Sequence, residues 1–158
     1  GDNSPVFNIR NEQGDYIRAF KHYFDCPKGN ISGTAVNRVL VDITIDESFH
    51  QAGFEITYFT RLQAVSDSQV RPNKIIFGVN RFNASNSMNV TKTVVEQHSE
   101  AASHCDVNVV VVSGTNYQIQ IQFSTTPNVS SAAGGWVEGA TVYSARFADV
   151  DYYFGART

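Results

Sequence analysis

The feature that most constrains this chain is a strict alternation of residue types near position 120. In "YQIQIQF", residues 117–123, apolar side chains alternate with glutamines. A period of two residues predicts a β-strand that buries one face and leaves the other in water. The apolar run "CDVNVVVVS" at 105–113 precedes it, and only Gly114, Thr115 and Asn116 lie between the two segments. Together they predict a β-hairpin.

The same signal recurs along the rest of the chain. In "NRVLVDITI", residues 37–45, every second side chain is apolar. Segments 8–10 and 15–24 flank the polar "NEQG", which favours a second hairpin. Further strands are expected in "FEITYFTRLQAV", "NKIIFGV" and "NVTKTVV". Only Val95–His104 has the composition of a short helix.

About nine or ten strands with so little helix define an all-β chain. Segments 83–87 and 125–135, which are rich in Ser, Asn and Gly, are expected to be connecting loops that do not divide the chain. Residues 1–158 are therefore predicted to form a single domain. The spacing of the strands favours a jelly-roll-like β-sandwich, with a closed barrel as the competing arrangement.

Charge and hydropathy exclude two classes of partner. The net charge is −3, and the 12 Lys and Arg residues are scattered singly rather than clustered as phosphate binding requires. No apolar run approaches the roughly 20 residues that a membrane-spanning helix needs. We therefore predict neither nucleic-acid binding nor a membrane span.

No enzyme motif is present. The sequence has no phosphate-binding loop, no nucleophile elbow and no His-Glu-x-x-His. Asp149 and Asp151 form a carboxylate pair, but such pairs usually face solvent or meet an arginine on a neighbouring strand. We predict no turnover enzyme. A glycan hydrolase is only the third hypothesis, because such an enzyme needs two carboxylates at a defined separation.

The potential metal ligands and the cysteines do not indicate a functional site either. His98 and His104 are weak metal candidates within a polar segment, since their spacing is neither that of a helical pair nor that of a zinc finger. No metal site is predicted. Cys26 and Cys105 lie far apart in the sequence and lack the dense pattern of secreted disulfide scaffolds. We expect two buried thiols that form no disulfide.

Aromatic residues are the best candidates for ligand binding. Trp136, the only tryptophan, follows "SSAAGG", and a ring at the edge of such a segment is suited to stacking on a sugar. Tyr58 and Tyr117 are weaker candidates of the same kind. The alternative is that the Trp136 ring closes one end of the sandwich core, which is the commoner use of such a side chain.

The C-terminal run "VYSARFADVDYYFG", residues 142–155, has apolar side chains on both faces when it is read as one strand. A sandwich buries only one face of a strand in its own core, so the other face needs a partner. We predict that some of these side chains pack against another copy of the chain: Tyr143, Phe147, Tyr152, Tyr153 and Phe154.

The segments "GWVEGATVYSARFADVDYYFG" and "YFDCPKGNISGTAVNRVLVDITI" resemble the C-terminal domains of bacteriophage tailspikes and tail fibres. Among these, the chain is most similar to the terminal domain of the preneck appendage proteins of small Bacillus podoviruses. This resemblance implies a homotrimeric jelly roll of the tumour-necrosis-factor type that brings three chains into register, so that a β-helical shaft upstream can fold. It places the protein in the phage tail, or in the host cytoplasm during assembly.

In such proteins the terminal domain can be an intramolecular chaperone that is released by autocatalytic cleavage. A chain beginning at "GDNSP" fits that history, and Asp2 and Asn3 are the weak candidates for self-cleavage. No cofactor is predicted. ATP would follow only from the family, with Lys28, Arg38 or Arg81 as its contacts. The alternative function is a host-receptor knob that binds cell-wall glycan through Trp136.

Overall fold

The computed structural model describes residues 6–10, 16–30, 36–45, 51–62, 67–81, 88–113, 116–124, 130–142 and 150–154. In chain order the elements are β1 (Val6–Arg10), β2 (Tyr16–Asn30), β3 (Val36–Ile45), β4 (Gln51–Leu62), β5 (Asp67–Arg81), β6 (Met88–Glu96), α1 (Ser99–His104), β7 (Cys105–Val111), β8 (Asn116–Phe123), β9 (Ser130–Val142) and β10 (Val150–Phe154). Within these residues, no helix is long and apolar enough to cross a membrane.

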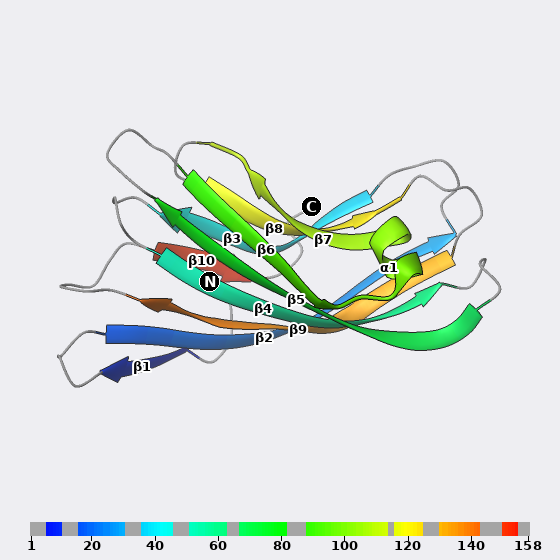
Figure 1. Cartoon of the computed structure of the whole chain (residues 1–158), viewed down its shortest axis with the longest axis horizontal. Coiled ribbons are helices and arrows are strands. Elements are labelled where there is room, and N and C mark those ends of the chain that lie inside the picture. Colours follow the sequence, from blue (N-terminus) through cyan, green and yellow to red (C-terminus); the bar gives the residue numbers. More distant parts are fainter. Residues whose placement is uncertain are drawn as a thin grey trace.

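The strands form two antiparallel sheets that stack as layers (Figure 1). One has the order β1-β2-β9-β4-β5-β6, and the other has the order β10-β3-β8-β7. Two long-range pairs, β2 with β9 and β3 with β8, are nested in chain order, as in a jelly roll. Strands β4, β5 and β6 instead form a meander. The predicted all-β, jelly-roll-like sandwich is confirmed.

The hairpin predicted from the alternating sequence is β7 paired with β8. Its register runs from Cys105 opposite Phe123 to Val111 opposite Tyr117. The burial of β8 alternates residue by residue, with Ile119 fully buried and the glutamines partly exposed. The face of β8 that carries the glutamines is therefore only partly exposed to solvent. The N-terminal hairpin is confirmed as well, as β1 pairs with β2.

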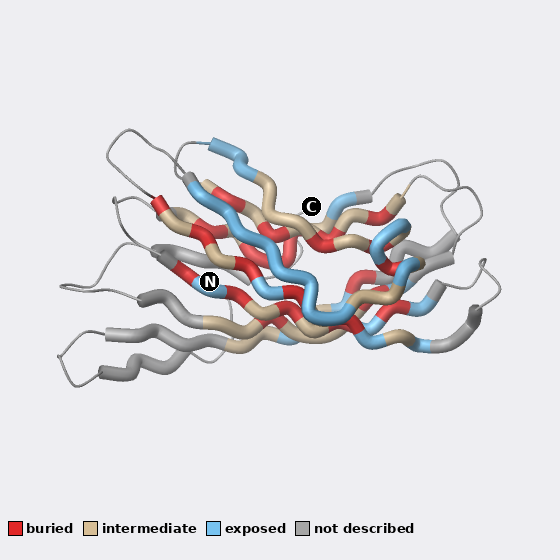
Figure 2. Tube along the Cα trace, in the orientation of Figure 1, coloured by how far each residue is buried: buried red, intermediate tan, exposed pale blue. Residues whose placement is uncertain are grey.

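The core lies between the two sheets and draws on both (Figure 2). Its largest fully buried side chains are Tyr58, Tyr117, Phe54, Phe77, Phe123, Leu40, Ile43, Ile56, Ile75 and Ile119. Burying an apolar side chain of this size stabilises a fold by about 1.5–3 kcal/mol. Cys26 and Cys105 are also buried and form no disulfide, as expected.

Strand β9 corrects one prediction. The second half of the expected loop 125–135 is not a loop, because Ser130–Val142 is a central strand between β2 and β4. Its small residues have a structural role. Gly135 lies opposite Phe24 on one side and Tyr58 on the other, and a Cβ atom there would overlap the backbone of β4 at Thr57. Glycine allows β9 to approach β4 beneath large aromatic neighbours.

The C-terminal run, residues 142–155, corrects a second prediction. It is not one strand, because Val142 ends β9 in the six-stranded sheet, whereas β10 starts at Val150 in the other sheet. The alternation therefore cannot be followed through the whole run, and that argument for a two-faced strand fails. β10, whose backbone alone is described, is an edge strand paired with β3. Tyr143 and Phe147 lie outside the described residues.

Candidate functional site

Three aromatic side chains gather on the outer face of the six-stranded sheet, on the adjacent strands β2, β9 and β4. Tyr23 is the direct cross-strand partner of Trp136. The ring centroids of Tyr23 and Phe59 each lie 6.1 Å from that of Trp136, with interplanar angles of 60° and 54°. Tyr23 is 67% exposed and Phe59 is 40% exposed. We call these three residues the aromatic platform.

Strand alternation explains why the platform faces outward. Phe59 follows Tyr58, which is completely buried, so the two rings lie on opposite faces of β4. Val137 follows Trp136 in the same way and is buried. Phe59 is paired with Gly134, which carries no side chain. That gap leaves room for the Phe59 ring to lean toward Trp136.

Charged groups border the platform. The ammonium group of Lys21 lies 4.9 Å from the centroid of the Trp136 ring and 5.4 Å from that of Tyr23, at cation–π distance from both. The indole Nε1 of Trp136 donates a hydrogen bond to the Glu138 carboxylate (3.3 Å). This polar contact fixes the ring edge, while Tyr23 and Phe59 keep exposed apolar surface. Such a surface combines apolar faces with hydrogen-bonding groups at its margin.

An ion pair lies further along the same face. Lys74 Nζ is 2.8 Å from a carboxylate oxygen of Glu55. The hydrogen bond and the charge of Glu55 raise the pKa of Lys74, so the ammonium form is stabilised. The Lys74 side chain is 41% exposed and the Glu55 side chain is 32% exposed. An ion pair as exposed as this contributes little to stability.

A surface pocket of about 250 Å³ lies beside the platform, at the point where β5 meets the end of β6. Its walls are Arg71, Pro72, Glu96, Gln97 and His98. Pro72 is exposed and is the direct cross-strand partner of Phe59. The platform and the pocket therefore adjoin each other through Phe59 and Pro72.

Two of the predicted sugar-stacking residues are core residues instead. Tyr58 and Tyr117 are both 0% exposed, so neither ring has a face available to a sugar. The Tyr117 hydroxyl donates to the Asn80 carbonyl (3.0 Å), and burial raises the Tyr117 pKa to about 12. Burial also raises the pKa of Tyr58. Trp136 alone of the three is at the surface, in the middle of a strand rather than beside a loop.

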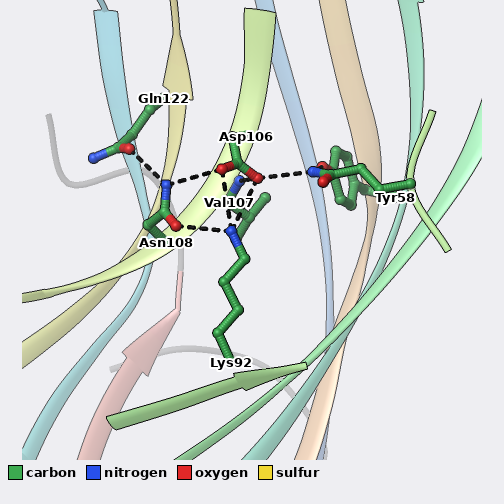
Figure 3. Close-up of polar contacts among 7 residues, drawn as sticks. Tyr58, Lys92, Asp106, Val107, Asn108 and Gln122 are labelled. Atoms are coloured by element: carbon green, nitrogen blue, oxygen red, sulfur yellow. Dashed lines mark hydrogen bonds and ion pairs between the residues drawn. The ribbon is translucent and has the colours of Figure 1, made fainter. Parts of the chain in front are cut away.

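Tyr58 belongs to a polar network around Asp106 (Figure 3). Lys92 Nζ on β6 lies 3.1 Å from each carboxylate oxygen of Asp106 on β7, and 2.8 Å from the amide oxygen of Asn108. Gln97 Nε2 donates both to Asp106 (2.7 Å) and to the Tyr58 hydroxyl (2.9 Å). β6 and β7 are edge strands of different sheets. The network therefore joins the two sheets along one side of the sandwich.

The two histidines hold the short helix α1 in place. The backbone N–H of Glu100 donates to His98 Nδ1 (3.3 Å), which makes His98 the N-cap. His104 Nδ1 lies 2.9 Å from the Ser124 hydroxyl, and its Nε2 lies 3.4 Å from the Glu100 carboxylate. Among the described residues, no group of three or more His, Cys, Asp or Glu side chains is placed to hold a metal ion.

The other candidates are not brought together. Arg38 lies on β3 of the four-stranded sheet, and Arg81 is buried at the end of β5 in the other sheet. Lys28 lies within β2, but its side chain is not described. Asp2, Asn3 and Asp149 fall outside the described residues, so self-cleavage stays a prediction. The signals that sequence reasoning missed are Tyr23 and Phe59, which flank Trp136 only because β2, β9 and β4 are neighbours.

No family model and no curated protein matches the sequence. Among solved structures, the chain is similar to the tailspike protein of Acinetobacter baumannii phage AM24, with 8% identity and a TM-score of 0.43 over 85% of this chain. It is also similar to the tailspike protein gp49 of Acinetobacter baumannii bacteriophage Fri1, described as a capsular polysaccharide depolymerase, with 10% identity and a TM-score of 0.45 over 94% of this chain. The chain spans 28% and 21% of those two proteins.

Both neighbours are phage tailspike proteins. The narrower likeness to preneck appendage proteins of Bacillus podoviruses stays a prediction.

Proposed function

We propose that this chain is a carbohydrate-binding β-sandwich of a phage tail protein, which attaches to glycan on the host surface. The observation that carries the proposal is the aromatic platform. Exposed rings on adjacent strands match the apolar faces of pyranose rings, and the groups at the margin match sugar hydroxyls. The platform is built on strands, so it is held in place before any ligand arrives.

The platform also explains why Trp136 is suited to this role rather than to closing the core. The core beneath it is already filled by Val137 and Tyr58, both 0% exposed. Trp136 makes its described ring contacts with Tyr23 and Phe59, which are themselves exposed. A residue that served only to close the core would not need exposed aromatic neighbours.

The test is adsorption of purified protein to host cells and to a glycan array. Trp136→Ala is expected to weaken binding about five- to tenfold, since stacking on one aromatic ring contributes on the order of 1 kcal/mol. Val111→Ala is the matched control, because Val111 is 53% exposed on the other sheet. Unchanged adsorption of Trp136→Ala with a normal circular dichroism spectrum would contradict the proposal.

A second candidate function is trimer assembly, in which the domain brings three chains of a fibrous protein into register. The observation that favours it is β6, which is exposed along its described length and lies at the edge of the six-stranded sheet (Figure 2). Val90, Val94 and Val95 are 37%, 49% and 54% exposed there. Proteins normally protect edge strands that carry apolar side chains.

A chaperone role with later release belongs to this second candidate. It predicts that a longer parent chain loses mass on assembly, at a bond near Asp2 and Asn3. Mass spectrometry of the parent protein before and after assembly tests it. A parent chain of constant mass in mature particles would count against release and would favour a permanent attachment domain.

A further inference from the structure

The pocket beside the platform extends the proposed binding site across the sheet. Strand register places the outward residues in rows that run perpendicular to the strands. One row is Tyr23, Trp136, Thr57, Lys74 and Glu96, which takes one residue from each of five adjacent strands. The next row contains Gly134, Phe59 and Pro72. The platform begins these rows, and the pocket ends them.

The length of the rows sets the size of the ligand. Neighbouring strands lie about 4.8 Å apart, so the four intervals from β2 to β6 span roughly 19 Å. One strand interval is close to the length of one pyranose unit. A monosaccharide would cover only part of such a surface, whereas an oligosaccharide that lies across the strands would reach from Tyr23 to the pocket.

The pocket offers different chemistry from the platform. Arg71 and His98 bring nitrogen groups to its walls, Glu96 supplies a carboxylate, and Pro72 supplies an apolar ring. The Gln97 Nε2 is already bonded to Asp106 and to the Tyr58 hydroxyl, so Gln97 contributes to the shape of the pocket. The backbone of the pocket is held in place from below, because the buried Asn73 accepts a hydrogen bond from the His98 N–H (2.9 Å). Convergent polar groups beside one apolar wall are typical of a sugar-ring subsite.

Charge on this face argues for an uncharged ligand. Cationic and anionic side chains are interleaved along it: Lys21, Lys74 and Arg61 against Asp25, Glu55, Glu96 and Glu138. A polyanionic glycan would lie against several carboxylates, and like charges brought together oppose binding. A neutral glycan meets both signs as hydrogen-bonding partners.

We propose that the aromatic platform and the Arg71–His98 pocket form one extended site for a neutral oligosaccharide that crosses the strands from β2 to β6. This inference rests on the proposed carbohydrate-binding function. It adds the direction, the length and the charge class of the ligand. The pocket holds the sugar unit at one end, and the platform holds the units at the other.

The test is isothermal titration of the intact chain with cello- and malto-oligosaccharides from disaccharide to hexasaccharide, and with oligogalacturonates as the acidic comparison. Affinity for the neutral series is expected to rise with length and then to level off once the site is filled. The double variant Pro72→Ala, Glu96→Ala is expected to lower affinity for the longest members about five- to tenfold and to leave the disaccharide unchanged. Trp136→Ala is expected to weaken the whole series.

The outcomes separate the two proposals. If no neutral or acidic oligosaccharide binds the wild-type chain, the carbohydrate-binding function itself fails. If oligosaccharides bind but affinity does not depend on length, or the pocket variant binds every length as the wild type does, the extended site fails while the function stands. Preference for oligogalacturonates that is lost in high salt would overturn the neutral ligand.

Discussion

Gly135 is the residue at which the packing of β9 can be tested most directly. A Cβ atom there would overlap the Thr57 carbonyl oxygen and lie 2.7 Å from the Tyr58 Cα atom, both in the backbone of β4. Backbone atoms of a central strand cannot move aside cheaply. Gly135→Ala is therefore expected to reduce the free energy of unfolding by about 3 kcal/mol, the upper end of typical overpacking costs. Urea denaturation measures the change.

Gly53→Ala is the matched control for this substitution. Gly53 lies on the adjacent strand β4, and its added Cβ atom would be 3.9 Å from the Phe77 carbonyl oxygen, which is an ordinary contact. We expect a change within about 0.5 kcal/mol. Equal effects of the two substitutions would mean that β9 and β4 are not packed as closely as described.

Cys26 gives a prediction about alkaline pH. Burial, reinforced by the charge of Asp25, raises the pKa of its thiol from 9.0 to about 11. A raised pKa in the folded state stabilises the fold below pH 9, and this contribution is lost as the pH rises toward 11. Wild type should lose about 2 kcal/mol more than Cys26→Ala over that interval. Parallel pH profiles of the two proteins in urea denaturation would contradict it.

At the residue scale, the sequence singles out Trp136 as a candidate but not its neighbours. Trp136 stands out because it is the only one. Tyr23 and Phe59 are 113 and 77 positions away from it, and only the pairing of β2, β9 and β4 brings the three rings together. Tyr58 is a sugar-stacking candidate by residue type alone, whereas strand alternation puts it on the same face as Phe54 and Ile56, which is the buried face of β4.

At the element scale, the connection from β6 through α1 to β7 depends on one buried amide. Asn73 on β5 is 1% exposed, and its Nδ2 donates to the Tyr58 carbonyl, the Thr60 hydroxyl and the Arg71 carbonyl, each at 3.2 Å. Its Oδ1 accepts from the His98 N–H. This residue therefore ties the start of α1 to two strands of the six-stranded sheet.

Asn73→Ala is expected to destabilise the protein by about 2–3 kcal/mol, because buried partners lose their hydrogen bonds. Amide hydrogen exchange should rise most in residues 97–104, since the His98 N–H loses its acceptor. Asn89→Ala is the control, because Asn89 is an exposed asparagine on β6. Uniform acceleration of exchange across all strands, with no excess at α1, would show that Asn73 does not hold this connection.

The elements themselves were predicted unevenly. Alternation located β3 and β8, whereas a continuous apolar run located β7. Alternation failed at β9, where Gly134 and Gly135 look like a loop in the sequence but are needed for close packing in the sheet. It failed again at the C-terminal run, since two strands in different sheets can present one continuous apolar pattern. Which strands pair is a long-range property that local periodicity does not contain.

At the scale of the whole molecule, the sandwich follows from the strand count and from the nested pairs β2–β9 and β3–β8. The sandwich architecture does not show which of its surfaces contact a partner molecule. Each sheet has two edge strands, β1 and β6 in one and β10 and β7 in the other. A trimer that uses the C-terminal residues would meet the molecule at β10, whereas the proposed glycan site lies on the outer face of the other sheet. Assembly through β10 is therefore compatible with carbohydrate binding, whereas assembly through β6 would cover the Glu96 end of the proposed site.

This separation gives a prediction for the assembled state. Sedimentation at micromolar concentration is expected to give three times the mass of the chain, because obligate interfaces commonly bury more than about 2,000 Å² and do not dissociate at such dilution.

Tyr153 is paired with half-buried Asp42, whereas Tyr152 is paired with fully buried Ile43. Tyr153→Lys is therefore the substitution chosen to produce a monomer without disturbing the core. Tyr23→Ala should keep the trimer and weaken glycan binding. A wild-type monomer would refute the trimer, and a trimer that dissociates in Tyr23→Ala would identify the aromatic platform as its interface.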